Sequence, residues 1–132
     1  MSSHEAAMPG WNLGVRLVLE LGSFAALGWA GWQMGGGGVG GVLLATVLPL
    51  AAMVLWGTFA VPGDPSRSGK APVPVSGAVR LAVEYAVFGG AVVALASQGA
   101  YVAAGVFAAV NVLHAAFGVP RLKWLLRYRV AA

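Results

Sequence analysis

The hexapeptides VRLVLE (residues 15–20) and VRLAVE (residues 79–84) are nearly identical, and each places an Arg and a Glu inside a long apolar stretch. The surrounding chain of 132 residues is 59% hydrophobic and only 9% charged. Soluble domains usually have roughly 25% charged residues, and a water-soluble surface cannot be built from so few. The composition therefore predicts a protein that folds in a membrane.

The uncharged stretches that follow the two hexapeptides predict helical hairpins. No charged residue occurs between Glu20 and Asp64, or between Glu84 and Arg121. Each stretch is close to twice the ~20 residues that a helix needs to cross the core of a bilayer. We therefore expect an all-α membrane protein with four transmembrane helices, arranged as two hairpins.

Breakers in the sequence place the ends of these four helices within a single domain, residues 1–132. The first hairpin loop is rich in Gly, the second contains Ser97, Gln98 and Gly99, and a long polar stretch rich in Pro separates the hairpins. The predicted spans are about 12–32, 41–61, 77–96 and 100–119, with a linker over 62–76 and a basic tail over 120–132.

The similarity between the two hairpins extends beyond the hexapeptides. Residues 15–24 align with 79–88, and LWGTFAVP (55–62) aligns with LHAAFGVP (113–120). The chain therefore looks like a duplicated helical hairpin. Two spans per copy give both copies the same orientation, so we expect a parallel repeat with a pseudo-twofold axis along the membrane normal.

Basic residues predict the orientation. The linker carries Arg67 and Lys70, the tail carries four basic residues, and the two hairpin loops carry none. The positive-inside rule then places the linker and both termini in the cytoplasm. The tail, which interleaves basic with apolar residues, is expected to anchor at the membrane interface. Because this rule and attraction to the lipid bilayer account for the net charge of +4, we do not predict nucleic-acid binding.

Polar side chains of the four helices are expected to meet in one layer in the cytoplasmic half of the bundle. A charged side chain at the centre of a membrane helix costs ~2.5 to 3.5 kcal/mol, so these groups should face the interior rather than lipid. This predicted polar layer is the candidate ligand site, and its members are Asn12, Arg16, Glu20, Trp56, Arg80, Glu84, Tyr85, Asn111 and His114.

Two pairings of the charged residues are open at this point. In a symmetric bundle, Arg16 meets Glu84 and Arg80 meets Glu20; the alternative is pairing within each helix, although Arg before Glu at i, i+4 is the less favourable order. We expect the pairing between helices. Because His114 aligns with Trp56, the second copy has more groups that exchange protons, and we interpret Glu84 with His114 as the more chemical pair and Glu20 with Trp56 as the more structural one.

Three segments give the chain a resemblance to a known family. RLVLE (16–20), PLAAMVLWGTFAVP (49–62) and VEYAVF (83–88) make it similar to the YrdB family of small bacterial membrane proteins, over about residues 12–117. The resemblance implies a four-helix membrane fold in the bacterial cytoplasmic (inner) membrane. It implies no activity, because the function of that family is not known.

Three classes of function therefore stay open. The first, which we favour, is binding or transport of a small or lipophilic ligand at the polar layer. The second is a membrane enzyme that uses a carboxylate and His114 as acid and base on a lipophilic substrate. The third is an accessory or assembly subunit with purely structural ion pairs. We predict no cofactor and no metal site, and homo-oligomer formation stays open.

Overall fold

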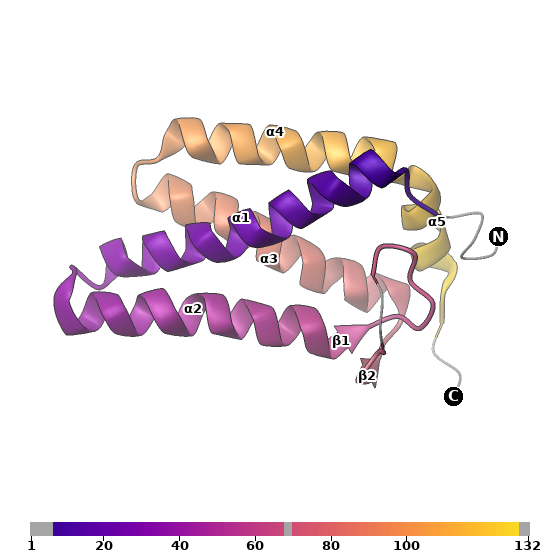
Figure 1. Cartoon of the computed structure of the whole chain (residues 1–132), viewed down its shortest axis with the longest axis horizontal. Coiled ribbons are helices and arrows are strands. Elements are labelled where there is room, and N and C mark those ends of the chain that lie inside the picture. The colour runs from indigo at the N-terminus through magenta and orange to yellow at the C-terminus, as the bar shows by residue number, and fades with distance from the viewer. Residues whose placement is uncertain (1–6, 68–69, 130–132) are drawn as a thin grey trace.

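The computed structural model describes residues 7–67 and 70–129, which form five helices and two short strands (Figure 1). The helices are α1 (Gly10–Met34), α2 (Gly38–Thr58), α3 (Gly77–Ser97), α4 (Tyr101–Phe117) and α5 (Val119–Arg127), and the strands are β1 (Phe59–Ala60) and β2 (Val73–Pro74).

The helix boundaries follow from local sequence. Glycines with positive φ, which other residues rarely adopt, make the turn between α1 and α2 (Gly36 and Gly37, φ 71°) and the turn between α3 and α4 (Gly99, φ 82°). At the start of α3, the Ser76 Oγ accepts a hydrogen bond from the Val79 amide (3.4 Å), as an N-cap does. Pro49 lies inside α2 without ending it.

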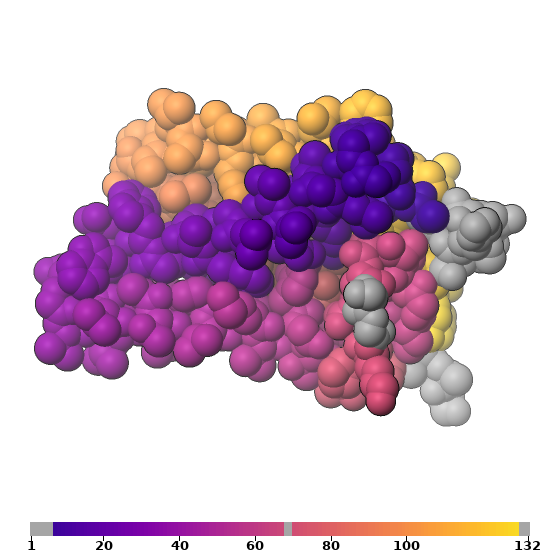
Figure 2. Space-filling model, in the orientation of Figure 1, coloured from indigo at the N-terminus to yellow at the C-terminus, as the bar shows by residue number. Residues whose placement is uncertain are grey.

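The four long helices lie side by side, and the bundle has two different ends (Figure 1). The turns that join α1 to α2 and α3 to α4 lie together at one end, which we call the loop end. The start of α1, both strands and α5 lie at the opposite end, which we call the linker end. In the space-filling view, α1 runs diagonally across the bundle between α2 and α4 (Figure 2).

Apolar side chains cover the outside of the bundle as well as its interior. Valines such as Val39, Val102 and Val112 are at least 70% exposed. The core is made of small and medium side chains, which form one cluster around Leu19 and Phe88 and a second cluster near the loop end. An apolar exterior is the pattern of a protein surrounded by lipid rather than by water.

Three helices, α1, α2 and α3, are long and apolar enough to cross a membrane. Helix α4 has 17 residues and qualifies only together with α5, from which it is bent by 73°. The structure thus supports a mostly helical membrane protein with three or four spans. The finer expectations, four spans and a duplicated hairpin, stay predictions.

The linker end differs in detail from the sequence-based expectation. The second helix ends at Thr58 rather than at residue 61, because the chain extends into β1, which pairs in parallel with β2 (Phe59 opposite Val73). The tail forms a short helix, α5, that folds back against the start of α3. A side chain at Gly77 would collide with the Leu125 carbonyl oxygen, so this contact requires glycine.

Candidate functional site

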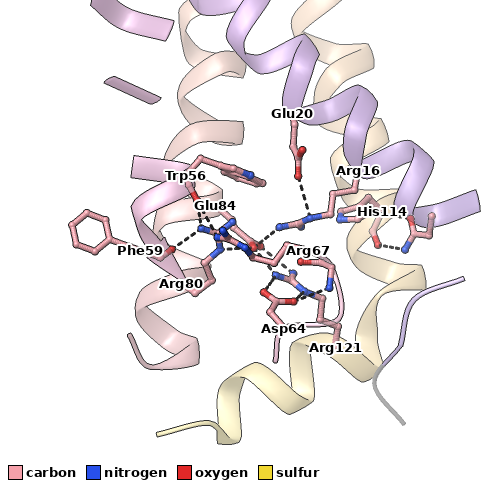
Figure 3. Close-up of polar contacts among 12 residues, drawn as sticks. Arg16, Glu20, Trp56, Phe59, Asp64, Arg67, Arg80, Glu84, His114 and Arg121 are labelled. Atoms are coloured by element: carbon pink, nitrogen blue, oxygen red, sulfur yellow. Dashed lines mark hydrogen bonds and ion pairs between the residues drawn. The ribbon is translucent and has the colours of Figure 1, made fainter. Parts of the chain in front are cut away.

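The charged residues of α1 and α3 gather at the linker end around one carboxylate (Figure 3). Glu84 of α3 is 3% exposed, and its Oε1 accepts a hydrogen bond from the Arg16 Nη2 of α1 at 2.6 Å. The predicted pairing of Arg16 with Glu84 is confirmed. Because α1 and α3 belong to different hairpins, this ion pair joins the two halves of the bundle.

Arg80 does not meet Glu20, so the second half of the predicted pairing is wrong. Its Nε donates to Glu84 within its own helix (3.0 Å), and its Nη1 donates to the backbone carbonyls of Trp56 and Phe59 (2.6 Å each). The last carbonyls of a helix have no partner within it, and in a bilayer an unpaired carbonyl costs several kcal/mol. Arg80 therefore turns to the carboxyl end of α2, where it satisfies these acceptors.

A third arginine reaches Glu84 from α5. Arg121 donates to both oxygens of Glu84, through Nη2 (2.6 Å) and Nη1 (3.1 Å). It also binds Asp64 of the linker with two bonds, Nε to Oδ1 (2.9 Å) and Nη2 to Oδ2 (2.8 Å). This bidentate geometry is the strongest form of the Arg–carboxylate interaction. We call Arg16, Arg80, Arg121, Glu84 and Asp64 together the Glu84 cluster.

Asp64 is almost fully buried in this cluster, although it belongs to the linker. Burial alone would raise the pKa of its carboxyl, but the hydrogen bonds and positive charge of Arg121 outweigh burial and hold that pKa below its usual range. Asp64 is therefore ionised at neutral pH and acts as a permanent partner for Arg121.

Charge within the cluster is close to balanced. Three arginines and two carboxylates leave one positive charge, and Glu20 beside Arg16 offsets it. Buried ions are costly unless each is paired, and loss of one partner leaves the other uncompensated. The cluster thus ties α1, α3, α5 and the linker into one unit.

Glu20 has a different environment. Its side chain is 22% exposed, and its only ion-pair partner among the described residues is the Arg16 Nε at 3.4 Å. It lines an open cavity of about 560 Å³, together with Arg16, Trp56 and the linker residues 65–67. We call this cavity the α1–linker cleft. Leu13 and Leu17 of α1 form its apolar wall.

Trp56 stands between the cluster and the cleft. The guanidinium carbons of Arg16 and Arg80 lie 5.0 Å and 4.6 Å from the centre of its ring. Both contacts are in the range of cation–π attraction. Trp56 therefore holds the two arginines in place while it contributes one wall of the cleft.

His114 pairs with Asn12 rather than with Glu84. The Asn12 Nδ2 donates to the His114 carbonyl (3.3 Å), which leaves the Asn12 Oδ1 facing the His114 Nδ1 at 2.9 Å. This arrangement requires a proton on Nδ1 of the ring. Asn12 thus links the start of α1 to the end of α4.

The remaining two members of the predicted polar layer lie at its margin or outside it. The Asn111 Nδ2 donates to the Phe107 carbonyl of its own helix (2.9 Å). Tyr85 is 46% exposed, and it lines a small cavity together with Glu84 and His114. Both Tyr85 and Asn111 also line an apolar groove on the surface of α3 and α4. The structure therefore brings Arg16, Trp56, Arg80 and Glu84 together, with Glu20 and Tyr85 at the edge, and leaves Asn111 apart.

Three residues at this end were missed by sequence reasoning: Asp64, Arg67 and Arg121. Arg67 and Arg121 were attributed to the positive-inside rule alone, and Asp64 was treated as part of a polar linker. One signal was available, because Asp64 is the only acidic residue between the two hairpins. Within the described ranges, no group of three side chains is placed to hold a metal ion.

Comparisons with known proteins agree on one family. Residues 14–112 match the family model described as "Protein of unknown function (DUF2568)". The chain is 39% identical over 115 residues to the "Uncharacterized protein YrdB" of Bacillus subtilis (strain 168), and the match covers 87% of this chain and 93% of that protein. No solved structure matches the chain significantly.

Proposed function

The chain belongs to the DUF2568 family of proteins of unknown function, and we propose that it is a ligand-binding protein of the bacterial cytoplasmic membrane. The ligand is small or lipophilic and binds at the linker end. One observation carries this proposal: the α1–linker cleft is open and is lined by the partly exposed Glu20 carboxylate and by Arg67, which forms no ion pair among the described residues.

Binding is favoured over transport by the distribution of charge along the bundle. The cluster near the loop end consists of Ala26, Ala91, Leu95 and Ala104, and the spans there contain no Lys, Arg, Asp or Glu. A transported polar solute would need partners along its whole path. The polar groups are confined to one end, as in a binding site.

Acid–base catalysis by Glu84 and His114 is disfavoured by their surroundings. The cavity that both residues line has room for about 10 Å³, which is no more than a single water molecule. Three arginines occupy the oxygens of Glu84. A carboxylate held in this way is a poor proton acceptor, so Glu20 is the better candidate for contact with a ligand.

The proposed orientation places the linker end in the cytoplasm, as the basic residues of the linker and tail indicate. The chain has no cysteine, so labelling of a single introduced cysteine shows on which side of the membrane that position lies. In intact cells, an impermeant thiol reagent should label Gln98→Cys at the loop end and leave Ala71→Cys in the linker unlabelled. Labelling of Ala71→Cys alone would reverse the orientation.

Binding is tested by thermal shifts of purified protein against phospholipids, quinones, isoprenoid phosphates and small metabolites. At least one class should raise the melting temperature of the wild type and raise that of Glu20→Gln less. Asn111→Ala, which lies outside the cleft, serves as the control and should respond like the wild type. The proposal fails if no class shifts the wild type, or if Glu20→Gln responds fully.

A further inference from the structure

The α1–linker cleft carries opposite charges on neighbouring walls, and this pattern narrows the class of ligand. We propose that the cleft binds a phospholipid whose headgroup contains both a phosphate and a primary ammonium, as in phosphatidylethanolamine. The phosphate is bound by Arg16, Ser66 and Arg67, and the ammonium is bound by Glu20. This inference rests on the proposed function, because it assigns the ligand of the same site.

The phosphate side is built from donors that the chain itself leaves unused. Arg16 is 2% exposed, yet its Nε and Nη1 have no hydrogen-bond partner in the described part of the chain, and the same is true of the buried Ser66 Oγ. A guanidinium and a hydroxyl are suited to phosphate oxygens. Both residues line the cleft, although these three atoms are themselves enclosed, so we expect the two side chains to turn toward a phosphate that binds there.

Arg67 adds a positive charge that no carboxylate of the described chain neutralises. Within the described part of the chain, it donates to two backbone carbonyls, those of Trp56 (3.5 Å) and Lys70 (3.2 Å). Its neighbour Asp64 is fully engaged by Arg121 and by the Ser66 amide. Arg67 is therefore the second cation available to a phosphate.

Glu20 supplies the opposite charge on the α1 side of the cleft. Among the described residues, its one ion pair is with the Arg16 Nε at 3.4 Å, so the partly exposed carboxylate can accept a further donor. An anion with no ammonium would be repelled by Glu20. A headgroup with an ammonium beside its phosphate would instead bind both walls.

The position of Arg16 within the bilayer and the apolar wall of the cleft favour a lipid over a soluble phosphate. Arg16 is the seventh residue of α1, and at ~1.5 Å per residue it lies about 9 Å from the start of a helix that spans the bilayer. This depth is close to the boundary between headgroups and acyl chains. Leu13 and Leu17, which are 36% and 54% exposed, continue the cleft along α1 as a surface for an acyl chain.

Native mass spectrometry of the full chain in detergent tests the proposal. The probes are phosphatidylethanolamine, phosphatidylglycerol and phosphatidylcholine with the same acyl chains, and soluble phosphoethanolamine. The wild type should prefer phosphatidylethanolamine to both other lipids by about tenfold, the effect of one charge-assisted hydrogen bond. Soluble phosphoethanolamine should not compete at equal concentration.

Two variants test the contribution of each wall of the cleft to lipid binding. Glu20→Gln should lose the preference for phosphatidylethanolamine over phosphatidylglycerol, and Arg67→Gln should weaken binding of both lipids about tenfold. Arg127→Gln, which removes an exposed positive charge of α5 away from the cleft, is the matched control and should bind as the wild type does. Unchanged melting temperatures would show that the variants are folded.

Equal binding of the three lipids, a preference retained by Glu20→Gln, or full competition by phosphoethanolamine would overturn the lipid assignment. If the thermal-shift panel then identifies another ligand that depends on Glu20, the proposed function stands and only this inference fails. If no ligand binds at all, both fail.

Discussion

The two segments with Arg and Glu four residues apart, Arg16–Glu20 in α1 and Arg80–Glu84 in α3, have the same spacing and opposite environments. Glu84 is 3% exposed and receives hydrogen bonds from three arginines. Glu20 is 22% exposed and has one arginine at 3.4 Å. Similar sequence thus produces a buried structural centre in one helix and an accessible carboxylate in the other.

The difference arises outside the segments themselves. Helix α5 brings Arg121, and the linker brings Asp64, to the α3 side only. Within residues 7–67 and 70–129, no comparable helix covers the α1 side, where the linker residues 65–67 leave a cleft. The surroundings supplied by the connecting segments therefore decide which carboxylate can meet a ligand.

The largest effect on stability is expected for Glu84→Gln. The substitution leaves three buried arginines without their shared carboxylate, and loss of one partner of a buried ion pair costs ~3 to 5 kcal/mol. A denaturing-detergent titration gives the free energy of unfolding. If Glu84→Gln lowers the free energy of unfolding by less than ~1 kcal/mol, Glu84 is no more important for stability than Glu20.

Asp64→Asn should cost about 1.5 to 3 kcal/mol at neutral pH, because it removes the charge that binds Arg121 through two hydrogen bonds. Since folding lowers the pKa of Asp64, its contribution is complete above its unfolded pKa of about 3.8 and disappears as the pH falls through the lower folded value. The difference in free energy of unfolding between the wild type and the variant should therefore be constant above about pH 4 and shrink as the pH falls further. A difference that does not depend on pH would contradict this account.

Gly77→Ala tests whether α5 must dock closely on α3. The new methyl group collides with the Leu125 carbonyl, so α5 has to shift, and overpacking of this kind costs ~1 to 3 kcal/mol. Gly89→Ala in the same helix is the control, because no atom lies within 4 Å of its added carbon. If both substitutions have the same effect on the melting temperature, the close packing of α5 on α3 at Gly77 is not required for stability.

The smallest effect is expected for Glu20→Gln. Partly exposed ion pairs contribute about 0 to 1 kcal/mol, so the free energy of unfolding should change by no more than that. The same detergent titration measures it. A loss as large as that of Glu84→Gln would show that the two carboxylates have equal structural roles.

Sequence alone predicts the helices and part of the cluster. The long uncharged stretches indicate the helices, and the similarity of the hexapeptides predicts the contact of Arg16 with Glu84. The sequence does not predict that Arg80 binds the carbonyls at the end of α2, because the sequence pattern places that end three residues later. Arg121 and Asp64 were missed because linker and tail lack a periodic pattern, so their positions depend on tertiary packing.

Double-mutant cycles on the two ion pairs compare the roles of Glu84 and Glu20 in one experiment. The cycles compare Arg121→Gln with Glu84→Gln, and Arg16→Gln with Glu20→Gln, by free energies of unfolding in one detergent. We expect a coupling energy of at least ~1.5 kcal/mol between Arg121 and Glu84, and less than ~1 kcal/mol between Arg16 and Glu20. Equal coupling energies would contradict the assignment of Glu84 to structure and Glu20 to the ligand.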